Sequence, residues 1–158
     1  MDIRALAATD LPLVIDLAYR IWPKAYAGVL SPEEIDNILG AIYTPSNLNA
    51  EMAAGHRFWA AYEGAAALGF ASGYRNDETV WLKKLYVLPE TQGRGVGRRL
   101  VETVVAAFAG AREIRLYVNS GNTAAQAFYR RCGFEKVLEV PVKMGDYDFL
   151  DFVFARPL

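Results

Sequence analysis

The clearest pattern of apolar and polar positions lies in the central third of the chain. Residues 80–88 are mostly aliphatic, aromatic or β-branched, and Pro89 follows them, so a strand is expected there. From residue 96 onward the apolar side chains recur at helical spacing with charged residues between them, which predicts a helix that turns one face to the core. The apolar positions of this helix are Val96, Leu100, Val104, Val105 and Phe108.

The residues before this centre predict three helices and three strands. Ser31-Pro32-Glu33-Glu34 is a strong helix start, because it supplies a cap, a proline at the first helical position and two acids in the first turn. The expected elements are a strand over residues 2–6, a helix from Thr9 or Asp10 to about Ala25, a helix from Ser31 to Gly40, a helix over residues 46–54, and strands over residues 57–63 and 66–74.

The residues after the centre predict three more strands and one helix. A strand is expected over residues 113–118, a helix from Asn122 to a C-terminal cap at Gly133, and a closing pair of strands over residues 135–142 and 148–154. The order of elements predicts an α/β fold with a mixed central sheet, mostly antiparallel with a parallel βαβ core, and with helices on both faces. We expect residues 1–158 to form a single domain.

Composition and charge narrow the range of functions. The chain has 158 residues, 53% of them hydrophobic, which is enough for a proper core. Its formal net charge is -1 with the charges interspersed, so neither nucleic acid nor an anionic membrane is an expected partner. A single cysteine excludes an internal disulfide, and no apolar run is long enough to span a membrane. A cytoplasmic protein without a metal site is therefore expected.

A glycine-rich turn joins the central strand to the central helix. The sequence is Gln92-Gly93-Arg94-Gly95-Val96-Gly97. Glycine lets backbone N–H groups approach a ligand closely, and the first amides of a helix point outward without partners. Arg94, Arg98 and Arg99 crowd the positive end of the helix dipole, where a bound anion would remove an unfavourable interaction. The turn therefore predicts a phosphate-binding site.

Two common phosphate-binding motifs do not fit this turn. A P-loop would close with Gly-Lys-Ser or Gly-Lys-Thr, which is missing here. A dinucleotide-binding fingerprint would place its third glycine at position 98, which is Arg98. It would also carry a ribose-binding acid about 20 residues further on, but here the next strand ends Tyr117-Val118-Asn119. An oxidoreductase that binds a dinucleotide is therefore disfavoured.

A second motif follows about 30 residues downstream. Asn122 precedes an alanine-rich stretch, Tyr129 follows it by seven positions, and Gly133-Phe134 closes the segment. Seven residues are about two helical turns, so Asn122 and Tyr129 lie near one face. This segment and the Gln-x-x-Gly-x-Gly turn together resemble the GNAT superfamily of N-acetyltransferases, and the resemblance covers residues 57–134 well.

The resemblance implies transfer of an acetyl group from acetyl-CoA to a primary amine by direct attack, without an acyl-enzyme. It implies that Tyr129 lies beside the thioester sulfur and donates a proton to the departing thiolate. The cofactor-binding residues that it implies are Leu85, Tyr86 and Val87 for the pantetheine, Gly93, Arg94, Gly95, Val96, Gly97 and Arg98 for the pyrophosphate, with Gln92 beside them, and Asn122, which contacts the cofactor or caps its own helix.

The general base stays open at this point. An alkylammonium with a pKa of about 10.4 needs roughly 4.6 kcal/mol to lose its proton at pH 7, so assistance is expected. Many family members place a glutamate on the central strand or on the next one, but here those strands offer Lys83, Lys84 and Tyr117. The candidates are Tyr86, Glu78, Asp146 and Asp148, each acting through water.

The acceptor and the assembly also stay open. Three short stretches, residues 26–33, 84–90 and 144–148, look similar to bacterial polyamine acetyltransferases of this type. The acceptor is therefore expected to be a small amine such as a polyamine, or a protein amino terminus, and a homodimer is left open. The missing base favours one alternative, a non-catalytic sensor that binds acyl-CoA.

Overall fold

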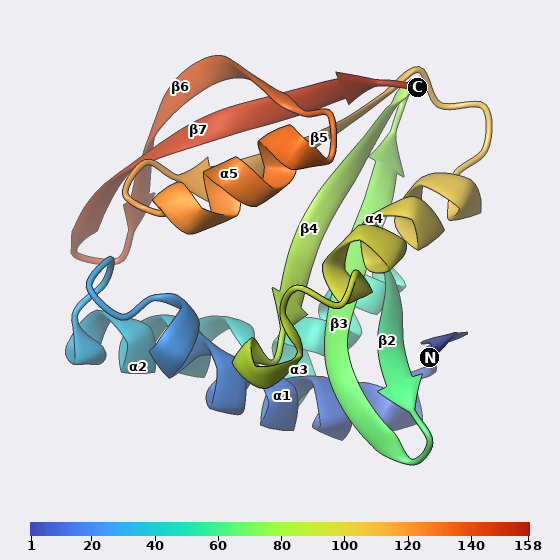
Figure 1. Cartoon of the computed structure of the whole chain (residues 1–158). Coiled ribbons are helices and arrows are strands. Elements are labelled where there is room, and N and C mark those ends of the chain that lie inside the picture. The colour runs from blue at the N-terminus through green and yellow to red at the C-terminus, as the bar shows by residue number, and fades with distance from the viewer.

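A single seven-stranded sheet organises the chain, in the order β1-β2-β3-β4-β5-β7-β6 (Figure 1). The computed structural model describes all of residues 1–158. Every neighbouring pair of strands is antiparallel except β4 and β5, which are parallel, so the predicted mixed sheet is confirmed. The strands are β1 Asp2–Ala5, β2 Arg57–Glu63, β3 Ala66–Asn76, β4 Thr79–Val87, β5 Glu113–Asn119, β6 Glu135–Met144 and β7 Tyr147–Pro157.

Helices cover both faces of the sheet, as predicted. The first three helices, α1 Leu11–Ala25, α2 Pro32–Ile42 and α3 Pro45–Ala53, pack around Phe58, Phe70 and Leu88 on one face. The other two, α4 Val96–Ala107 and α5 Thr123–Arg131, pack on the opposite face with Ile114, Leu116 and Phe154. Each face therefore has its own apolar cluster. No helix has the length and apolar composition that a membrane crossing requires.

The start of α2 follows the prediction and its end does not. The Ser31 hydroxyl accepts a hydrogen bond from the Glu34 amide at 3.1 Å, and the Glu34 carboxylate accepts one from the Ser31 amide at 2.8 Å. The helix continues past Gly40 to Ile42, so the predicted end at Gly40 is wrong. A glycine inside a helix costs only about 1 kcal/mol relative to alanine. Burial of Leu39 and Tyr43 on either side outweighs that cost.

The two parallel strands form a fork. β4 and β5 pair only over their first three residues, from Thr79 with Glu113 to Trp81 with Arg115. The register of β4 against β3 then shifts, because Ser72 pairs with Lys84 whereas Gly73 pairs with Leu82, which leaves Lys83 as an extra residue in β4. Figure 1 shows the two strands diverging beyond this point. From Leu82 onward, one edge of β4 therefore has no strand partner.

Candidate active site

A cavity of about 600 Å³ opens where β4 and β5 diverge. Its walls come from the end of α1, the unpaired half of β4, the turn before α4, and α5. The fold thus brings together nearly all of the residues that the two sequence motifs predict. Those that line the cavity are Leu85, Tyr86, Val87, Gln92, Gly93, Gly95, Val96, Gly97, Arg98, Asn122 and Tyr129.

The glycine-rich turn leaves the start of α4 open to a ligand. Gly93 and Gly95 have φ angles of 83° and 79°, a left-handed conformation that side chains with a Cβ rarely adopt. A Cβ built on Gly95 would meet no protein atom within 4 Å, and Gly95 lines the cavity. No side chain caps the first amides of α4. These amides can therefore donate hydrogen bonds to an anion.

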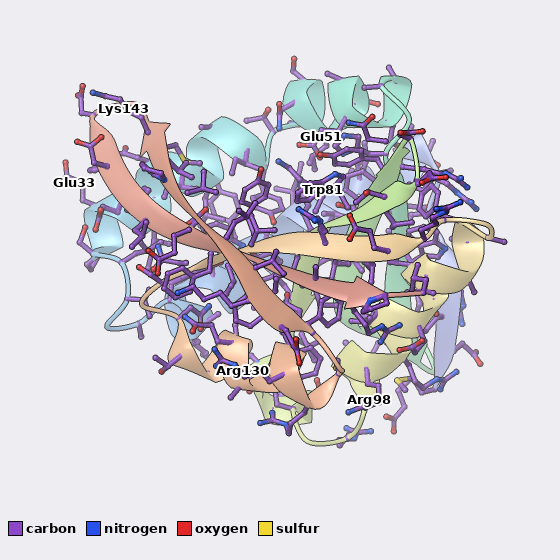
Figure 2. The ribbon with its side chains drawn as sticks, turned by 90° about the horizontal axis from the view of Figure 1, so that it is seen from above. Glu33, Glu51, Trp81, Arg98, Arg130 and Lys143 are labelled. Atoms are coloured by element: carbon purple, nitrogen blue, oxygen red, sulfur yellow. The ribbon has the colours of Figure 1, made fainter.

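The three arginines near this turn do not converge on one point. Arg98 lines the cavity, and its guanidinium donates a hydrogen bond to the carbonyl of Arg131 at 2.7 Å. Arg94 pairs instead with the Glu63 carboxylate, and Arg99 donates to the carbonyl of Met1 at 2.9 Å. Of the three arginines, Arg98 is the one that lines the cavity, and Figure 2 shows it on the side of the molecule formed by α4 and α5.

The charges along the cavity have one sign. Four cationic side chains line it, and no carboxylate does: Lys24, Lys83, Arg98 and Arg131. These four side chains provide positive charge along the cavity wall. The uncapped start of α4 and the unpaired edge of β4 provide backbone hydrogen-bond donors along the same wall. This arrangement suits an extended, multiply charged anion such as a nucleotide with several phosphates.

Tyr129 lies in this cavity on α5. Asn122 caps that helix, since its Oδ1 accepts a hydrogen bond from the Ala125 amide at 3.1 Å, so the capping role expected for Asn122 is observed. The Tyr129 ring is buried edge-on against Phe128 and Phe134. Burial raises the pKa of its phenol well above the usual value, and nearby Tyr26 and Cys132 add to the shift. Tyr129 is therefore protonated at neutral pH and can donate a proton.

Comparisons with known proteins identify the same protein class that the two sequence motifs predict. Residues 54–136 match the family model described as an acetyltransferase (GNAT) domain. The chain belongs to the GNAT family of acetyltransferases. Family membership confirms the enzyme class that the motifs predict, an N-acetyltransferase with acetyl-CoA as co-substrate.

Several relatives match this GNAT chain along nearly its full length. A spermidine N(1)-acetyltransferase from Thermoplasma acidophilum is 27% identical over 99% of this chain and 96% of its own. An uncharacterized N-acetyltransferase from Mycobacterium tuberculosis is 30% identical over 95% of this chain and 99% of its own. Among solved structures, a PaiA N-acetyltransferase from Thermoplasma acidophilum in complex with coenzyme A has a TM-score of 0.82 at 25% identity, covering 99% of this chain and 98% of that one.

None of the carboxylates considered as the general base of this GNAT enzyme lines the cavity. Glu78 directly precedes β4, at the end where β4 and β5 are paired, and its carboxylate lies 3.2 Å from the Arg112 guanidinium. Asp146 and Asp148 are exposed at the hairpin between β6 and β7. The structure therefore does not place any of these three candidates in the wall of the cavity that holds Tyr129.

Tyr86 does line the cavity, but its hydroxyl is already engaged. The hydroxyl lies 2.9 Å from that of Tyr26, the C-terminal cap residue of α1. Burial raises the pKa of the Tyr86 phenol well above its usual value, as does the neighbouring Tyr26. The phenolate form that a base requires is therefore disfavoured at neutral pH. Tyr26 and Tyr86 instead form a fixed pair of hydroxyls on the cavity wall.

A second, smaller cavity of about 150 Å³ adjoins the first. Tyr26, Tyr86 and Tyr117 line both cavities. Most of the second cavity is apolar or aromatic, and Asp151 of β7 is the single charged residue in its wall. Sequence reasoning missed Asp151. One feature of the sequence could have pointed to it: Asp151 interrupts the apolar run of residues 149–154. On a strand it shares a face with Phe149 and Val153, so an apolar side chain would be expected at that position.

Proposed function

We propose that this protein transfers the acetyl group of acetyl-CoA to the primary amino group of a small aliphatic amine. One observation carries the proposal: a single cavity joins an open, cation-flanked helix start to a buried, protonated tyrosine. An anion-binding end and a proton-donating end are the two parts that a thioester of a large phosphorylated carrier requires.

The cavity supports a definite placement of acetyl-CoA. The pyrophosphate would bind backbone amides of residues 93–98 and the Arg98 guanidinium, since all of these residues except Arg94 line the cavity and no side chain caps the start of α4. The amide groups of the pantetheine arm would pair with the free edge of β4 at Leu85, Tyr86 and Val87, in the way that an added strand pairs with a sheet edge. This placement brings the thioester toward Tyr129.

The chemical step is direct attack of the amine on the thioester. The neutral amine nitrogen forms a bond to the acetyl carbonyl carbon, the carbon–sulfur bond breaks, and its electron pair stays on sulfur. The sulfur takes the proton of the Tyr129 hydroxyl, the nitrogen releases its extra proton to solvent, and Tyr129 regains a proton from solvent. Positioning by the cavity walls supplies much of the remaining rate enhancement.

The small-amine acceptor rests on two supports. The spermidine acetyltransferase relative aligns over nearly the whole of both chains, so the segments that border the acceptor side are included in the match. The second cavity is compact and carries one acid among apolar walls, which suits a cationic group on an aliphatic chain. A protein amino terminus would have to bring a peptide backbone into the same walls.

A screen of acceptors tests the proposal. Wild-type protein is mixed with acetyl-CoA and one amine at a time, and release of the free thiol is followed together with the mass of the acetylated product. Aliphatic amines should release thiol in step with product. Acetylation of peptide amino termini alone would refute the small-amine acceptor. Tight binding of acetyl-CoA without turnover on any amine would favour the sensor alternative.

A further inference from the structure

The two adjoining cavities carry opposite charge. The larger has four cationic side chains in its wall and no carboxylate, whereas the smaller has the Asp151 carboxylate and no cationic side chain. The walls thus separate a region for an anion from a region for a cation. The larger cavity matches the phosphates of acetyl-CoA, and the smaller one matches a positively charged acceptor.

Asp151 has no partner inside the protein. Its backbone pairs with Asn119 of β5 and Val140 of β6, but its carboxylate makes no hydrogen bond or ion pair. The side chain is partly buried, and this burial raises the pKa of the carboxyl group above its ordinary value. A partly buried carboxylate without a counter-charge is costly, and a bound cation would offset that cost.

The position of Asp151 separates it from the reacting atoms. Tyr129 lines only the larger cavity and Asp151 lines only the smaller one, while the hydrogen-bonded pair of Tyr26 and Tyr86 borders both. An acceptor nitrogen that reaches the thioester beside Tyr129 is therefore a different atom from a group bound at Asp151. A molecule that fills both positions needs two polar ends and an apolar chain between them.

We propose that the smaller cavity binds the chain and the nonreacting ammonium group of a short aliphatic diamine, with Asp151 as the residue that binds this ammonium. The proposal rests on the proposed function. Aromatic walls from Trp22, Tyr26 and Tyr86 favour a cation near their ring faces and tolerate methylene groups. The second amino group of the diamine then lies beside the tyrosine pair, within reach of the thioester.

Asp151→Asn tests the proposal with two acceptors of equal chain length, diaminobutane and butylamine. For the wild-type protein we expect a KM for diaminobutane roughly 10- to 100-fold below that for butylamine, the range of a hydrogen bond to a charged group. In Asp151→Asn the KM for diaminobutane should rise to that of butylamine, with kcat changed far less. Asp16→Asn, which removes an exposed carboxylate on α1 outside both cavities, is the matched control and should keep the wild-type preference.

Binding measured without turnover separates this inference from the proposed function. Calorimetric titration of diaminobutane into the protein saturated with coenzyme A should show binding to the wild type and to Asp16→Asn, and a loss of affinity of at least tenfold in Asp151→Asn. Equal affinity in wild type and Asp151→Asn would overturn the role of Asp151, as would a fall in kcat with KM unchanged. Binding of diaminobutane that depends on Asp151, without any acetyl transfer, would refute the proposed function and leave the subsite intact.

Discussion

Replacing Tyr129 with phenylalanine removes one oxygen from the reacting end of the cavity. The ring stays buried against Phe128 and Phe134, and the hydroxyl makes no hydrogen bond to another protein group, so its loss leaves no partner unsatisfied. We therefore expect the free energy of unfolding to change by less than about 1 kcal/mol. The chemical step should lose the proton donor, and kcat should fall roughly 100-fold, equivalent to about 2.7 kcal/mol of transition-state stabilisation.

The assay follows thiol release from acetyl-CoA at saturating amine, with calorimetry for the affinity of acetyl-CoA. The affinity should change less than about threefold, because the hydroxyl acts mainly in the transition state. Tyr19→Phe removes a hydroxyl from an exposed tyrosine of α1 that lines neither cavity and should behave like the wild type. Wild-type kcat in Tyr129→Phe would refute the assignment of Tyr129 as the proton donor.

Three further predictions concern the cofactor site and the core. Gly95→Val should weaken acetyl-CoA binding by roughly tenfold or more in calorimetry, whereas Gly64→Val, at a turn with φ of 60°, carries similar backbone strain outside the cavity and should leave affinity unchanged. Acetyl-CoA affinity should also fall as salt rises, because the wall is cationic; affinity independent of salt would contradict the phosphate placement. Lys84→Met should lower the free energy of unfolding, measured in urea, by about 3 to 5 kcal/mol, because the Lys84 ammonium is buried 2.6 Å from the Glu51 carboxylate. Adding Glu51→Leu should recover part of the loss. An unchanged urea midpoint of unfolding in Lys84→Met would contradict a structural role for the pair.

Most of the fold could be predicted from the sequence because its elements carry local signals. Apolar spacing identifies the helices on both faces, and the cap at Ser31 and the glycine turn mark where two of them begin. The fork between β4 and β5 could not be predicted, since it depends on the register of β4 against β3 and on the extra residue Lys83. Register is a property of paired strands, and no single stretch of sequence encodes it.

The residues of the candidate site also fall into two groups, those that the sequence predicts and those that it does not. Residues of the glycine turn and of α5 belong to continuous motifs, so the sequence predicts them together and the fold places nearly all of them in one cavity. Arg94 belongs to the same motif, but its guanidinium forms an ion pair with Glu63 at the end of β2. Tyr26 and Asp151 come from opposite ends of the chain and meet only through tertiary packing, which local patterns do not record.

A crystal structure of the complex with coenzyme A tests the central claim most directly, through the distance between the thiol sulfur and the Tyr129 hydroxyl oxygen. The account predicts that the pyrophosphate lies on the amides of residues 93–98 and that the sulfur lies within hydrogen-bond distance of Tyr129. Coenzyme A bound elsewhere, or in the cavity with its sulfur far from Tyr129, would contradict the account.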